Sequence, residues 1–99
     1  MFLAMVLANA RRVEARAVEF SVENSDARID LLLIDGSSQP LSAPPAEVLL
    51  KIIDELESGK RHFQANVYTA SIEEVKIARG DTSILARVSR WKIDHCDDD

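Results

Sequence analysis

The sequence predicts an α+β domain, a mostly antiparallel sheet of about five strands with two helices packed against it. Two segments, residues 2–17 and 44–57, repeat apolar residues at the spacing of one helix face. Two others, residues 17–36 and 61–93, alternate apolar and polar residues, as strands with one buried face do. Turn-forming residues separate these segments, which favours hairpins and antiparallel pairing.

The first helix is predicted over residues 2–17. Its apolar stripe consists of Leu3, Val6, Leu7, Ala10, Val13 and Ala17. The alternative is a secretion signal, because residues 8–10 have the small-x-small form of a cleavage site. No positive charge precedes the apolar run, and the run is too short to span a membrane, so the helix is favoured.

Residues 17–36 are the stretch on which the rest of the chain is expected to pack. They read as two strands joined by a polar turn at residues 24–26 and closed by a second turn at residues 35–36. The second strand ends in the apolar run 31–34, which predicts that this end is covered on both faces.

A loop rich in serine and proline is expected over residues 37–45, and the second helix is predicted to begin at Pro44-Pro45. The apolar stripe of this helix consists of Val48, Leu49, Ile52, Ile53 and Leu56. Gly59 suits the left-handed conformation that ends many helices. This helix is the most strongly patterned element of the sequence.

Three strands are predicted in the last third of the chain. The first follows Arg61, the second begins at about Glu74, and the third covers residues 83–93. The segment that begins at Ser71 is also compatible with a short capped helix. A tight turn at residues 79–81 joins the last two strands.

Length and composition fit one domain, expected over residues 1–94, with an acidic tail at residues 95–99. The net charge of −5 and the scattered basic residues argue against a nucleic-acid partner. The single cysteine, Cys96, excludes an intramolecular disulfide and fits a reducing compartment, so a cytoplasmic location is expected.

Enzymatic activity is not expected. The chain contains no phosphate-binding loop, no dinucleotide-binding glycine motif and no nucleophile elbow. Its two histidines are His62 and His95, and the adjacent residues 95–97 cannot easily converge on one metal ion. The sequence therefore predicts neither a catalytic centre, nor a cofactor, nor a metal site.

Two groups of residues are candidates for binding. Glu19 and Glu23 share one strand face, but four strand residues separate them by more than about 10 Å, too far for an acid/base pair. They are expected on a solvent-facing strand edge, or, together with Arg28, as polar contacts to a nucleotide. The second group, Phe2, Val6 and Trp91, are apolar candidates for a protein interface, although a core role is favoured for Trp91.

Four short motifs follow one another in a set order. They are AVEFSVE at residues 17–23, IDG at residues 34–36, the helix-opening PP at residues 44–45 and ARVS at residues 86–89. Together they resemble the N-terminal, PAS-like domain that precedes the motor domain in type II secretion and type IV pilus ATPases. In that family the corresponding segments read A-S-D-I-H-I-E, V-R-F-R-I-D-G, a proline-started helix and V-D-V-R-V-S.

The resemblance implies a PAS-like fold, but the chain departs from the family at nucleotide-contacting positions. Leu31 and Leu33 stand where the family carries arginines, and Ser21 stands where it carries a histidine. No Walker motif of the motor domain occurs in these 99 residues. The resemblance therefore implies architecture rather than ATPase activity.

Two functions follow as hypotheses. The first is a non-catalytic interaction or assembly domain, whose partner is another protein or a second copy, either within a larger secretion-ATPase-like protein or as a stand-alone relative. The second is a PAS-like sensor that binds a small ligand or nucleotide between the sheet and the helices. Solid packing beneath the helix at residues 48–56 would contradict the second hypothesis.

Overall fold

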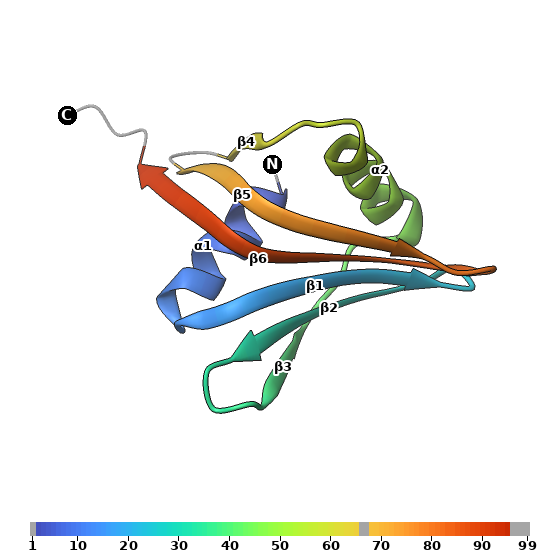
Figure 1. Cartoon of the computed structure of the whole chain (residues 1–99), viewed down its shortest axis with the longest axis horizontal. Helices are drawn as coiled ribbons and strands as arrows, with labels where there is room; N and C mark the ends of the chain where they lie inside the picture. The colour runs from blue at the N-terminus through green and yellow to red at the C-terminus, as the bar shows by residue number, and fades with distance from the viewer. Residues whose placement is uncertain (1, 66–67, 96–99) are drawn as a thin grey trace.

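The computed structural model describes residues 2–65 and 68–95, which form an antiparallel sheet of six strands with two helices (Figure 1). The α+β class is as the sequence predicts, with one strand more. The elements in chain order are α1 (Phe2–Arg12), β1 (Ala15–Glu23), β2 (Asp26–Leu33), β3 (Ser38–Leu41), α2 (Ala46–Glu57), β4 (His62–Ala65), β5 (Tyr68–Arg79) and β6 (Ser83–His95).

The strand order is β3-β2-β1-β6-β5-β4, so strands from the two ends of the chain pair at the centre of the sheet. In β1 and β6, Val18 faces Val88 and Glu23 faces Ser83. Each half of the sheet is a three-strand meander preceded by a helix. The hairpin turns β1–β2 and β5–β6 consequently lie side by side at one end of the molecule (Figure 1).

One face of the sheet holds the core and the other is open. On β1 the core side chains are Val18, Phe20 and Val22, at most 5% exposed, and the alternate residues point to the opposite face. Buried side chains of both helices belong to the same core cluster, so both helices cover this one face. Within the described residues, no helix covers the open face.

The predicted loop at residues 37–45 is wrong in its first half, because residues 38–41 form β3 at the edge of the sheet. Pro40 lies opposite Asp30 in this strand. Proline cannot donate to a strand ladder, but an edge strand pairs on one side only and tolerates it. The proline and serine content that predicts a loop therefore also fits a short edge strand.

Helix α1 ends at Arg12, five residues earlier than predicted. Glu14 adopts a positive φ of 58°, and Ala15 already pairs with Leu33 of β2. Ala17 consequently belongs to β1, and Val13 lies between the two elements and is 39% exposed. Strand pairing here overrides the apolar period of the sequence.

Helix α2 begins at Ala46, after Pro44-Pro45, with Pro45 at the cap position and no side-chain cap. Gly59 has φ 108°, and its left-handed conformation at the helix end is confirmed. In the apolar run at residues 31–34, Leu31 is fully buried, Leu32 and Leu33 are partly buried, and Ile34 lies in the turn after β2 and is 69% exposed. The predicted full coverage of both faces is therefore wrong.

Strand β5 is one continuous strand from Tyr68, so the predicted start at about Glu74 is too late and the short-helix alternative is wrong. An irregularity in its pairing with β6 lies between Ile72 and Val75. Strand β6 continues to His95, beyond the predicted end at residue 93. Asn66, Val67 and the remainder of the acidic tail, including Cys96, lie outside the described residues.

Candidate functional site

The three polar residues predicted to contact a ligand share the open face of the sheet. Glu19 and Glu23 occupy alternate positions on β1, on the side opposite to the core residues. Arg28 on β2 lies across from Ser21, which stands between the two glutamates. The structure therefore brings the three side chains onto one face, but on a sheet surface rather than inside a cavity.

Glu19 is engaged by its neighbour on β6. The Nε and Nη2 atoms of Arg87 donate to its Oε2 atom at 2.8 Å and 2.5 Å, and the Glu19 side chain is 19% exposed. Because β1 is a central strand, the predicted placement on a strand edge is wrong. The ion pair of Glu19 with Arg87 therefore links β1 to β6, where the two halves of the sheet meet.

Trp91 and Val6, two of the predicted interface residues, lie in the core. Trp91 is 4% exposed, and its indole Nε1 donates to the carbonyl oxygen of Leu7 at 3.1 Å. Val6 is 7% exposed, and Phe2 is partly buried against the same core. Within the folded chain, Val6 and Trp91 therefore offer almost no surface to a partner. This corrects the interface prediction for Val6 and confirms the core role favoured for Trp91.

The space beneath α2 is filled by side chains. Leu49, Ile53 and Leu56 are fully buried, and Ile52 is 3% exposed. All four belong to the single core cluster. No ligand pocket therefore lies directly beneath residues 49–56, which counts against the sensor hypothesis.

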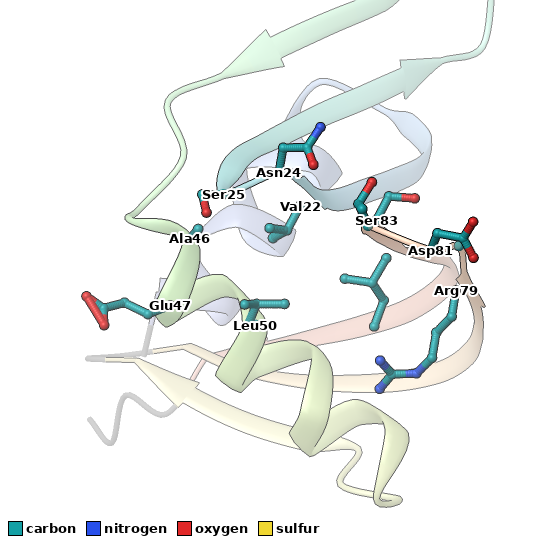
Figure 2. Close-up of a pocket in the computed structure, with 12 residues that line it drawn as sticks. Val22, Asn24, Ser25, Ala46, Glu47, Leu50, Arg79, Asp81 and Ser83 are labelled. Carbon is teal, nitrogen blue, oxygen red and sulfur yellow. The ribbon is translucent and has the colours of Figure 1, made fainter.

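A groove that the sequence did not predict lies at the hairpin end of the sheet, and we call it the tip groove (Figure 2). Its volume is about 530 Å³. It lies between the first half of α2 and the turns β1–β2 and β5–β6. Its lining consists of Val22, Asn24, Ser25, Ala46, Glu47, Leu50, Arg79, Gly80, Asp81, Thr82, Ser83 and Ile84.

The floor of the tip groove is apolar and its frame is held by backbone contacts. Val22 faces Ile84 across β1 and β6, and Leu50 of α2 points into the space while remaining 40% exposed (Figure 2). The amide of Asn24 donates to the carbonyl oxygen of Thr82 at 3.1 Å, which ties the two turns together. The groove is therefore a preformed feature of the tip.

The rim of the tip groove is acidic. Glu47 and Asp81 stand at opposite sides and point outward (Figure 2). The Arg79 guanidinium forms an ion pair with Glu57, its Nε donating at 3.1 Å, and lies 3.8 Å from a carboxylate oxygen of Asp54. Glu57 and Asp54 thus neutralise this guanidinium, which leaves the carboxylates of Glu47 and Asp81 at the rim to attract cationic groups.

The ion pair between Glu57 of α2 and Arg79 of β5 shifts the pKa of both side chains. The hydrogen bond from Arg79, reinforced by its charge, holds the pKa of Glu57 below its ordinary value. The same hydrogen bond, together with the negative charge, raises the pKa of Arg79. Both groups therefore stay charged through the neutral range, and the link persists there.

The sequence does not reveal the tip groove because three distant segments assemble it, and the predicted turn at residues 79–81 does not by itself indicate a groove. One signal is the exposed apolar Leu50, which lies outside the predicted apolar stripe of α2. Among residues 2–65 and 68–95, no three His, Cys, Asp or Glu side chains gather as a metal site would require. No described helix is long and apolar enough to cross a membrane.

Comparison with known proteins does not add a family. No family model matches the chain, and no curated protein matches it at a significant level. The fold and the tip groove therefore stand on the geometry described above.

Proposed function

We propose that this chain is a non-catalytic protein-interaction or assembly domain that acts in the cytoplasm, of the kind that precedes the motor domain of type II secretion and type IV pilus ATPases. The observation that carries the proposal is the tip groove, a preformed surface with an apolar floor and an acidic rim. Exposed apolar surface framed by charge is typical of a site that another protein covers.

The character of the tip groove favours a protein partner over a small molecule. It is open, and its walls combine aliphatic side chains with turn backbone and carboxylates. Small-molecule sites usually enclose most of the ligand, with a few convergent polar groups. Here Glu47 and Asp81 diverge, which suits a broad contact better (Figure 2).

The motifs that resemble the secretion ATPase domain support the same proposal. The IDG at residues 34–36 forms the turn between β2 and β3, and the PP at residues 44–45 immediately precedes α2. Leu31, at a position where that family has an arginine, is fully buried. Leu31 thus contributes to the core instead of offering charge to a nucleotide.

One observation favours nucleotide binding as a second candidate. Arg28 is exposed on the open face and forms no ion pair with any residue in the described ranges, so its guanidinium is available to a phosphate. Glu19 and Glu23 flank it on β1 and oppose the approach of such an anion. The balance of charge therefore favours the protein-binding proposal.

An amide-resolved NMR titration of the full chain with Mg-ATP and Mg-ADP tests this proposal. The expected result is no localised, saturable shift at millimolar nucleotide, because carboxylates surround Arg28. Saturable shifts around Glu19, Glu23 and Arg28 that disappear in Arg28→Ala would contradict it and establish the sensor function. Arg90→Ala, which removes an exposed arginine from β6, is the control variant.

A further inference from the structure

A second charged surface lies where α1 meets β1, and we call it the basic corner. It consists of Arg11, Arg12, Val13 and Arg16, all of which are exposed. Val13 is 39% exposed and is one of the few large apolar side chains on the surface of the described residues. Three arginines outnumber the one exposed carboxylate of this segment, Glu14, so the basic corner has the opposite net charge to the rim of the tip groove, and Val13 offers an apolar contact.

The arginines of the basic corner form no ion pair within the described part of the chain. None of Arg11, Arg12 and Arg16 forms an ion pair with any other residue in the ranges 2–65 and 68–95. Two of them lie in the last turn of α1, where the helix dipole already stabilises positive charge. Their guanidinium groups are therefore free to pair with carboxylates from outside the molecule.

The two surfaces lie at opposite ends of the molecule. Strand β1 begins at Ala15, beside the basic corner, and ends at Glu23, beside the tip groove. Nine strand residues span about 26 Å. The longest axis of the molecule measures 47 Å, and in Figure 1 the α1–β1 junction is at the left and the hairpin turns are at the right.

We propose that the basic corner of one copy docks into the tip groove of the next, a contact that rests on the proposed assembly function. Val13 would lie against Leu50 on the apolar floor. Arg11 and Arg12 would face the carboxylates of Glu47 and Asp81. The occupant of the groove is thus a second copy of this chain.

The opposite charges of the basic corner and the tip groove favour a second copy of this chain as the partner that fills the groove. The whole chain carries a net charge of −5, so two copies repel each other on average. Segregation of unpaired arginines at one end and surplus carboxylates at the other reverses this repulsion in one orientation only. Because the two docking surfaces differ, each contact leaves one corner and one groove free, so copies add head to tail.

Charge-reversal variants of the full chain test this contact by sedimentation velocity. One variant carries Arg11→Glu and Arg12→Glu, and the other carries Glu47→Lys and Asp81→Lys. Wild type is expected to grow beyond a dimer with increasing concentration, whereas each variant alone associates at least about tenfold more weakly. Mixing the two variants restores growth, because each altered surface meets an oppositely charged one.

Arg90→Glu is the matched control, because it reverses one exposed charge on β6 outside both surfaces, and it is expected to associate as wild type does. Circular dichroism confirms that each variant is folded. A variant that merely misfolds cannot be restored by mixing, which separates loss of contact from loss of structure. Variants that still associate like wild type, or that stay monomeric in the mixture, would overturn the proposal.

The outcomes also separate this inference from the function on which it rests. A wild type that remains monomeric at all concentrations, or that stops at a dimer, overturns head-to-tail contact but leaves association with a different protein open. Saturable nucleotide binding at Arg28 in a wild type that stays monomeric overturns the assembly function as well.

Discussion

At the scale of single residues, the turn between β2 and β3 has a carboxylate held by one serine. The Oγ atom of Ser37 donates to the Oδ1 atom of Asp35 at 2.6 Å, and the backbone amide of Ser37 donates to the same atom at 2.9 Å. These bonds, the side-chain bond first, hold the pKa of Asp35 below its ordinary value. A lowered pKa in the folded state means that the ionised form stabilises the turn.

Replacement of Ser37 by alanine is expected to raise the pKa of Asp35 toward its ordinary value, because the side-chain donor is lost and the amide donor remains. The contribution of Asp35 to stability is present above its unfolded pKa and is lost as the pH falls through the lower folded pKa. NMR titration of the carboxyl carbon measures the shift. Ser42→Ala, in an exposed loop position, is the control, and an unchanged pKa in Ser37→Ala would contradict this assignment.

The single tryptophan is the second residue that decides local structure. Trp91→Phe removes the hydrogen bond to the Leu7 carbonyl and leaves unfilled volume between β6 and α1. Together these losses are expected to lower the free energy of unfolding by about 1–3 kcal/mol. Urea unfolding followed by circular dichroism measures it.

Val48→Ala on the exposed side of α2 is the control for this prediction and should change the unfolding free energy by less than about 0.5 kcal/mol. If Trp91→Phe unfolds at the same urea concentration as wild type, the indole does not anchor α1 to the sheet.

At the scale of elements, the β1–β2 hairpin is closed by two residues in an unfavourable backbone conformation. Asn24 and Ser25 have φ values of 50° and 70°, the left-handed pair that two-residue hairpin turns require. Asparagine tolerates this region and serine does so less well. The turn conformation therefore matches the twist of the two strands, and the backbone of Ser25 is strained as a result.

Glycine at position 25 is expected to relieve this strain and to stabilise the chain by about 0.5–1 kcal/mol, since glycine adopts positive φ without steric cost. Thermal and urea unfolding measure the change. Ser42→Gly is the matched control, because Ser42 does not have a positive φ and added freedom there destabilises. A loss of stability in Ser25→Gly would show that the turn is not strained.

Element types follow from sequence where local pattern and tertiary structure agree. The α2 stripe is confirmed at Leu49, Ile52, Ile53 and Leu56 but is wrong at Val48, which is 41% exposed. The helix end at Gly59 and the turn after Glu23 are confirmed. The predictions fail where strand pairing, rather than local sequence pattern, determines the secondary structure. Strand β3 has a loop-like composition and forms because β2 has a free edge, and Ala17 leaves the helix because β1 begins before it.

At the scale of the whole molecule, the order of strands places two hairpin turns and the start of α2 at one end. No local pattern predicts that residues 22–25, 46–50 and 79–84 line one groove. The same topology puts the α1–β1 junction at the other end (Figure 1). The placement of the basic corner and the tip groove at opposite ends is therefore a property of the fold rather than of any segment.

Association through these ends is expected to weaken as salt is added. Ion pairs between exposed arginines and carboxylates are screened when the Debye length falls from about 8 Å at physiological salt to about 3 Å at 1 M. Sedimentation of wild type in a salt series measures the effect. Association that strengthens with salt would indicate an apolar contact elsewhere on the surface.

The central claim is that this domain acts through its surface, and an amide-resolved NMR dilution series of the wild-type chain tests it most directly. The predicted result is a concentration-dependent change confined to two regions, the tip groove around Leu50 and Ser83 and the basic corner around Arg12 and Val13. Spectra that do not change with concentration, or changes confined to the open face around Arg28, would contradict the account.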